Sequence, residues 1–180
     1  MTEPRVKVAT CSLAGCFGCH MSFLDMDEAI VPLIQRIEFD RSPLTDIKQI
    51  GRCDIGLVEG GLCNTENREV LHQFRAHCNI LVAVGACAIN GGVPAMRNHY
   101  PLAECLAESY LNGVNVVDPQ IPRDAELPPL LEQVIPIGQE VRVDYFLPGC
   151  PPPAAAFMEI VSAVLEQREP QLEYQQRRFD

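Results

Sequence analysis

The sequence predicts an α/β domain built on a doubly wound parallel sheet with helices on both faces. Short apolar runs rich in β-branched residues alternate along the chain with longer helical patterns, which favours a parallel sheet covered on both sides. The chain has 180 residues, of which 47% are hydrophobic, so it is long enough and apolar enough for one domain with a proper core. Cysteine-containing loops follow several predicted strands. A functional site is therefore expected at the carboxyl edge of the sheet.

The predicted strands are apolar runs bounded by Gly, Pro or polar turns. In chain order they cover residues 5–10, 54–59, 79–85, 114–118 and 143–147. Helical patterns cover residues 22–37, 66–78, 103–111, 127–133 and 153–168. We expect a single domain over residues 1–170, with a Pro-rich surface connection at 118–129 and a polar tail at 171–180 that is available to a partner.

Four cysteines fall in three loops that share a pattern. The first loop, Cys16-Phe-Gly-Cys19, follows the first predicted strand. The second, Gly85-Ala-Cys87, begins where the third strand stops, and the third, Pro148-Gly-Cys150, follows the last strand. Because ligands of doubly wound sheets gather outside the carboxyl ends of the strands, these loops are expected to meet. Four thiolates converging at one edge suit a [4Fe-4S] cluster, whose usual protein ligands are cysteines. Glycines beside them allow close backbone approach: Gly15, Gly18, Gly85 and Gly149.

Two other kinds of site begin with the same local motif. An isolated Cys-x-x-Cys is also typical of a thioredoxin-like dithiol or of half a zinc site. Zinc sites usually take a second local pair, whereas here the third and fourth candidates, Cys87 and Cys150, are single cysteines far apart. A dithiol would leave both of them unexplained, so the three loops together favour the cluster.

The composition of the chain argues against some classes of partner and indicates the cellular compartment. The formal charge of −10 and the pI near 4.8 argue against nucleic acid and anionic membrane surfaces as partners. No apolar run approaches the roughly 20 residues that a membrane-spanning helix needs, and the N-terminal residues lack a secretory signal pattern. We therefore expect a cytoplasmic protein. Nine cysteines in such a chain indicate metal or redox chemistry more than a disulfide framework.

Together with Glu59-Gly-Gly-Leu-Cys63, the three loops resemble the small subunit of [NiFe]-hydrogenases. The stretch over residues 13–25 is similar to the cytoplasmic, NAD-reducing branch of that family, and the resemblance extends over residues 6–167. It implies that four cysteines ligate the proximal [4Fe-4S] cluster: Cys16, Cys19, Cys87 and Cys150. It also implies a separate large subunit that carries the Ni–Fe centre. Electrons would then pass to diaphorase subunits, which hold FMN and further clusters and reduce NAD.

Differences from other branches of the family predict that this chain holds only one cluster, a [4Fe-4S] cluster of the ordinary cubane type. Periplasmic and membrane-bound relatives have a C-terminal extension with two more clusters, whereas only 30 residues follow Cys150 here and none is a cysteine. Oxygen-tolerant relatives have two extra cysteines at positions that Gly18 and Gly92 occupy in this chain. The related quinone-reducing subunit of respiratory complex I has adjacent cysteines in the first loop, which the Cys-x-x-Cys spacing here does not match.

Glu59 and His20 are the candidates for a supporting role around the cluster. Glu59 closes the second predicted strand, and burial beside an anionic cluster is expected to raise its pKa and couple proton uptake to reduction. His20 either donates a hydrogen bond to a cluster sulfur or faces a partner from a helix start. The other cysteines and histidines are expected to be core residues, residues at the cluster edge or surface residues: Cys11, Cys53, Cys63, Cys78, Cys105, His72, His77 and His99.

These observations predict an electron-transfer subunit without a hydrogen-activating site of its own. One alternative keeps the chemistry but changes the acceptor to a ferredoxin or a deazaflavin. Another is a flavodoxin-like FMN-binding module, because the predicted fold is flavodoxin-like. The phosphate loop of such a module is rich in Ser and Thr after the first strand, whereas residues 10–19 supply cysteines instead.

Overall fold

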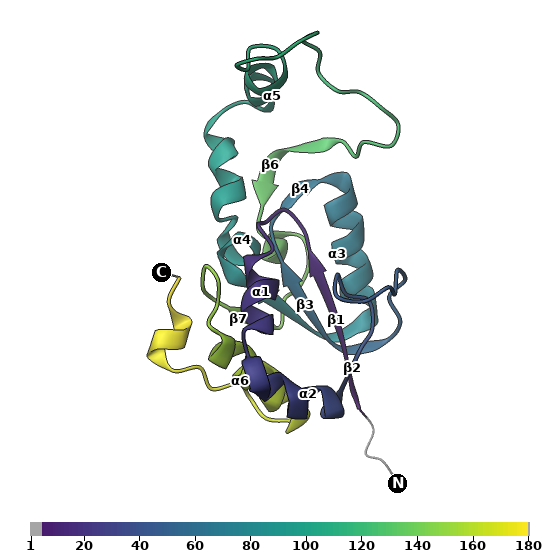
Figure 1. Cartoon of the computed structure of the whole chain (residues 1–180), viewed down its shortest axis with the longest axis vertical. Helices are drawn as coiled ribbons and strands as arrows, with labels where there is room; N and C mark the ends of the chain where they lie inside the picture. Colours follow the sequence, from purple (N-terminus) through teal and green to yellow (C-terminus); the bar gives the residue numbers. More distant parts are fainter. Residues whose placement is uncertain (1–4, 180) are drawn as a thin grey trace.

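The computed structural model describes residues 5–179 and has a five-stranded parallel sheet at its centre (Figure 1). The strand order is β2-β1-β3-β5-β7, which is the doubly wound, flavodoxin-like order with its reversal between β1 and β3. The strands are β1 (Val6–Ser12), β2 (Ile37–Phe39), β3 (Cys53–Glu59), β5 (Cys78–Val84) and β7 (Tyr145–Leu147). All neighbouring pairs in this sheet are parallel, so the predicted fold class is confirmed.

Helices cover both faces of this sheet and bury a separate core on each. On one face, α1 (Gly18–Leu24), α2 (Ile30–Arg36) and α6 (Ala154–Leu165) pack through apolar side chains such as Phe23, Leu33 and Phe157. On the other face, α3 (Thr65–His77) and α4 (Gly85–Asn90) pack through residues that include Phe74 and Ala88. Burial on both faces explains why the central strands read as nearly continuous apolar runs.

Two predicted elements are wrong. Residues 114–118 form no strand, because Asn115 and Asp118 have φ angles of 67° and 52°, which an extended strand does not contain. Residues 127–133 do not form a helix. Two prolines at 128–129 precede β6 (Leu130–Ile135), which pairs antiparallel with β4 (Leu62–Asn64) in a small second sheet. Short β2 and β4 are strands that the sequence interpretation missed.

The predicted helix over residues 22–37 is divided. It begins earlier, as α1, and is interrupted at Asp27, whose φ of 48° ends the α-helical path before the 3-10 turn η1 (Asp27–Ala29) and α2. The remaining predicted helices correspond to α3, α5 (Leu102–Tyr110) and α6 within a few residues at most of their ends. The described residues also contain three further short 3-10 helices: η2 (Val93–His99), η3 (Ile137–Gln139) and η4 (Tyr174–Arg177).

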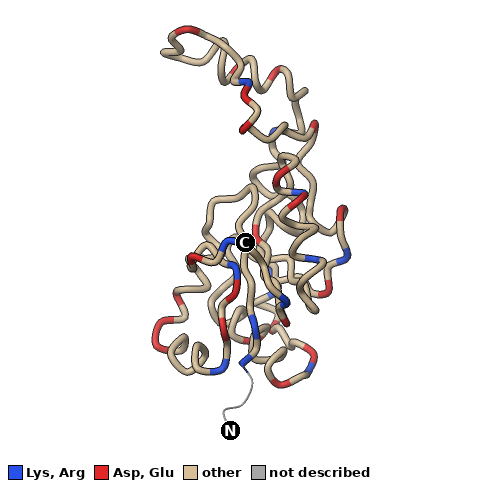
Figure 2. Tube along the Cα trace, turned by 90° about the vertical axis from the view of Figure 1, so that its right-hand side faces the viewer, with Lys and Arg blue, Asp and Glu red and all other residues tan. Residues whose placement is uncertain are grey.

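An arm projects from this body. It consists of α5 and the connection that follows it, and in Figures 1 and 2 it extends beyond β4 and β6. No residue of α5 is buried. Figure 2 shows Lys and Arg scattered among Asp and Glu along the chain, without a continuous basic stretch. Within residues 5–179, no helix is long and apolar enough to cross a membrane.

A four-cysteine cavity at the carboxyl edge of the sheet

The structure brings the four predicted ligand cysteines to a single cavity. Its lining combines the loop after β1 with the start of α1, the first turn of α4 after β5, and the loop after β7, and it also includes the end of β3. Cys16 and Cys150 are exposed, whereas Cys19 and Cys87 are partly buried, so the cavity opens to one side. The residues that line it are Gly15, Cys16, Gly18, Cys19, Glu59, Gly60, Cys87, Gly149, Cys150 and Pro151.

Hydrogen bonds join the loops to one another. The Ala86 N–H donates to the Gly149 carbonyl at 2.8 Å, which ties the second cysteine loop to the third. The Ser22 hydroxyl donates to the Pro152 carbonyl at 2.6 Å, which ties α1 to the third loop. Ala14 and Gly61 exchange two backbone hydrogen bonds at 3.0 and 2.9 Å between the first loop and the residues after β3. These hydrogen bonds connect the segments that carry the four cysteines to one another.

Glycines lie against three of the four sulfurs. A Cβ atom added to Gly85 would lie 2.5 Å from the Cys19 Sγ, one added to Gly92 would lie 2.9 Å from the Cys87 Sγ, and one added to Gly18 would lie 3.1 Å from the Cys16 Sγ. Gly85 and Gly92 also have positive φ angles, 79° and 47°. This cradle leaves room around the sulfurs only because these residues lack side chains, as a bulky inorganic group requires.

The two partly buried thiols, Cys19 and Cys87, have raised pKa values. Burial raises the pKa of Cys19, and the nearby Glu59 carboxyl raises it further. Burial also raises the pKa of Cys87, with smaller contributions from Cys150 and Cys16. Metal binding would have to displace protons from these thiols, which couples affinity to pH.

The donor set fits a polynuclear cluster. Among the described residues, no three His, Cys, Asp or Glu side chains are close enough together to hold a single metal ion. Four cysteine thiols around one cavity are compatible with a four-iron cluster, whose usual protein ligands are cysteines.

Glu59 and His20 contact each other beneath the first cysteine loop. The Glu59 side chain is only 3% exposed and lies 3.2 Å from the His20 Nδ1, while the Ser12 hydroxyl donates to it at 2.6 Å. Burial raises the pKa of Glu59, but the hydrogen bonds from His20 and Ser12 outweigh it and hold the pKa below its usual value. The predicted rise of this pKa concerns Glu59 beside a bound cluster and stays a prediction.

Both ring nitrogens of His20 are engaged inside the protein. Nε2 lies 2.9 Å from the Thr10 Oγ1, Nδ1 contacts Glu59, and the ring stacks on Phe17 with centroids 4.6 Å apart. The side chain is 6% exposed. His20 thus neither donates to a sulfur nor faces a partner in this arrangement, because its hydrogen-bonding capacity is used within the fold.

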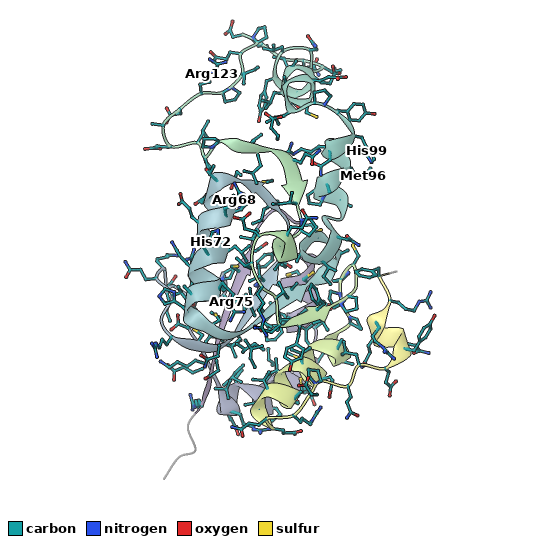
Figure 3. The ribbon with its side chains drawn as sticks, turned by 180° about the vertical axis from the view of Figure 1, so that it is seen from behind. Arg68, His72, Arg75, Met96, His99 and Arg123 are labelled. Carbon is teal, nitrogen blue, oxygen red and sulfur yellow. The ribbon has the colours of Figure 1, made fainter. Side chains whose placement is uncertain are left out.

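The remaining cysteines and histidines lie away from the cavity lining. Cys53 and Cys78 are buried in the core beneath α3, as expected of small apolar residues. Cys11, which was expected near the edge of the cluster, is buried in the same core and does not line the cavity. Cys63 and Cys105 are partly buried, and the Cys63 Sγ donates to the Asn67 side chain at 3.2 Å. The three remaining histidines, His72, His77 and His99, are exposed. The His72 Nε2 lies 3.0 Å from a carboxylate oxygen of Glu140; His72 and His99 are labelled in Figure 3.

A polar network beneath the first loop was not predicted. The Thr10 hydroxyl lies 2.7 Å from the Ser42 hydroxyl and connects His20 to the loop after β2. Ser12 and Glu59 are direct partners in the register of β1 and β3. Strand periodicity together with the correct register would have identified this last pair.

This combination of sheet and cysteine loops is that of the iron–sulfur small subunits of redox enzymes. The chain belongs to the family of the NADH ubiquinone oxidoreductase 20 Kd subunit, whose model matches residues 16–164. Within that family it is 46% identical to the NAD-reducing hydrogenase HoxS subunit delta of Cupriavidus necator, over 99% of this chain and 87% of the relative. The resemblance to hydrogenase small subunits is therefore confirmed.

Two further comparisons agree. The chain matches a subunit in a crystal structure of an NAD+-reducing [NiFe]-hydrogenase with a TM-score of 0.96 and 50% identity, covering 98% of this chain and 100% of that one. It is 34% identical to a subunit of the F420-non-reducing hydrogenase of Methanococcus voltae, over 93% of this chain. It spans only 59% of the length of that relative.

Proposed function

We propose that this chain is the electron-transfer small subunit of an NAD-reducing [NiFe]-hydrogenase and holds one [4Fe-4S] cluster. The observation that carries the proposal is the convergence of three loops on one cavity lined by four cysteines. Cys16, Cys19, Cys87 and Cys150 would ligate the cluster. The cluster supplies one-electron storage within reach of a redox centre on a partner.

The chain's own residues would hold, orient and partly shield this group. Cys19 and Cys87 would bind it from the partly buried side, and Cys16 and Cys150 from the open side. The open side is the natural place for a partner's redox centre to approach. The partners are a large subunit with the Ni–Fe centre and diaphorase subunits with FMN and further clusters, in the cytoplasm. Of the expected domain 1–170 and tail 171–180, residues 5–170 would form the folded domain and residues 171–179 the tail; residues 1–4 and 180 lie outside the described residues.

Metal analysis and cysteine variants test the proposal. After anaerobic reconstitution, the full chain should contain about four iron and four sulfide per molecule. Replacing any one of the four cavity cysteines by Ser should remove or destabilise the cluster, whereas Cys53→Ser and Cys78→Ser, in the buried core, should leave its spectrum unchanged. Stoichiometric zinc without sulfide, or a normal cluster in Cys87→Ser, would refute the assignment.

The acceptor is tested separately. A hydrogenase that serves a ferredoxin or a deazaflavin would have the same cluster site but would purify without flavin-containing NAD-reducing subunits. We expect the native complex to contain them and to reduce NAD with hydrogen. An FMN-binding module is disfavoured, because the loop after β1 places Cys16 and Cys19 where a flavodoxin-like protein has its phosphate loop.

A further inference from the structure

The Glu59 carboxylate connects the two ends of the first cysteine loop. Ser12, the last residue of β1, donates its hydroxyl to the Glu59 Oε1 at 2.6 Å. His20, in the first turn of α1, donates its backbone N–H to the Glu59 Oε2 at 3.2 Å, and its Nδ1 lies 3.2 Å from Oε1. Cys16 and Cys19 lie between these two attachment points.

The backbone secures only the first half of this loop. The Leu13 N–H donates to the Glu59 carbonyl at 2.9 Å, and Ala14 pairs with Gly61. Gly60 permits this contact, because a Cβ there would lie 2.8 Å from the Leu13 carbonyl carbon. Among the described residues, the hydrogen bonds that join positions 16–20 to β3 end on the Glu59 side chain.

The attachment is part of a closed and satisfied network. The His20 Nε2 lies 2.9 Å from the Thr10 Oγ1, and the Thr10 Oγ1 lies 2.7 Å from the Ser42 Oγ. Within the described part of the chain, no buried side-chain nitrogen or oxygen lacks a hydrogen-bond partner. A fully satisfied buried network is rigid and specifies one arrangement. Phe17, whose φ is 66°, stacks on the His20 ring and so adds a packing contact within the same loop.

A buried carboxylate at this place is costly without a role. Desolvation of an ionised group disfavours folding unless hydrogen bonds compensate it, and an anion beside a cluster with negative charge is unfavourable as well. We infer that Glu59 is a positioning residue, whose carboxylate holds Cys16 and Cys19 in the geometry that faces Cys87 and Cys150. This inference rests on the proposed cluster function.

The reconstituted full chain tests the inference through cluster retention and spectroscopy. In Glu59→Ala, the second half of the loop loses its hydrogen bonds to β3. Iron loss to a chelator should become about 10-fold faster, in line with the effect of removing groups that orient ligands. The electron paramagnetic resonance spectrum of the reduced cluster should also change. Glu59→Gln keeps a carbonyl oxygen that can accept from the His20 N–H and gains an amide N–H that can donate to the Ser12 hydroxyl, so it should restore both properties to nearly those of the wild type.

Controls separate this inference from the proposed function. Glu69→Gln changes an exposed glutamate on α3 and should match the wild type in every measurement. If Glu59→Ala does not fold, Ser12→Ala removes one attachment and should shift retention in the same direction by a smaller amount. An unchanged retention rate and spectrum in Glu59→Ala, or a Gln variant as defective as Ala, would overturn the inference. Absence of iron and sulfide from the wild type would instead refute the cluster itself.

Discussion

Gly85→Ala is the change that tests most directly how the cavity is built. Gly85 is the first residue of α4 and has a φ of 79°, in the left-handed region that favours glycine. An alanine Cβ at this position would lie 2.5 Å from the Cys19 Sγ, inside van der Waals contact, and 3.5 Å from the Gly149 carbonyl. One methyl group therefore strains the backbone and displaces a predicted ligand.

The expected cost combines two terms. Placing alanine in the left-handed region costs about 1–2 kcal/mol, and overpacking a closely packed site typically adds about 1–3 kcal/mol. The lower entropy of alanine in the unfolded chain offsets only about 0.4–1 kcal/mol. We expect Gly85→Ala to lower the free energy of unfolding by about 2–4 kcal/mol, a large part of the roughly 5–15 kcal/mol of a typical domain.

Urea unfolding of the full chain, read as the midpoint at constant slope, measures this cost. Reconstitution of the variant should also give less bound iron, because the Cys19 Sγ must move. Gly138→Ala is the matched control, since its added Cβ would meet the Phe146 ring only at 3.7 Å or more. If Gly85→Ala unfolds within about 0.5 kcal/mol of the wild type, like an ordinary surface substitution, the close approach inferred here is wrong.

Two further predictions concern the frame that carries the loops. Asp144 accepts from Arg75 at 2.6 Å and from the Leu81 N–H at 2.8 Å; burial raises its pKa, but these partners hold it below the usual value. Asp144→Asn should therefore cost about 1–3 kcal/mol near pH 7. Because the folded pKa is the lower one, that stability is present above the unfolded pKa of about 4 and is lost as the pH falls through the folded value. The wild type and Asp144→Asn should thus converge in acid unfolding, and a constant gap below pH 4 would contradict this account. Asn64→Ala removes the side chain that accepts from the Asn67 N–H at 2.8 Å at the start of α3, which should lower the urea midpoint by the equivalent of about 1 kcal/mol; no change would mean that the cap does not contribute.

The sheet was predictable because its central strands are buried on both faces. The apolar runs over β1, β3 and β5 stand out in the sequence, and parallel topology follows from their alternation with helices. The arm was not predictable in this way. Its α5 contains no buried residue, and its connection contains positive φ angles at Asn115 and Asp118, so the apolar residues at 114–118 did not indicate a strand.

The cysteine loops were predictable from their position after strands, but the contacts that organise them were not. Cys16, Cys19, Cys87 and Cys150 could be grouped because the carboxyl ends of parallel strands share one edge. The pKa direction of Glu59 depends on which polar groups reach it, and that is set by the register that pairs it with Ser12 and by the packing of α1. A single sequence shows neither.

The topology itself explains why a side chain is needed beneath the first loop. β1 and β3 are neighbours at the point where the strand order reverses, so the segments that follow them leave toward opposite faces of the sheet. α1 packs in one core with Phe23, and α3 packs in the other with Phe74. Backbone pairing between the two segments therefore ends at Ala14 and Gly61, before either cysteine of the loop. Because Glu59 projects from β3 toward the α1 face, its carboxylate can span the gap that the diverging backbones leave.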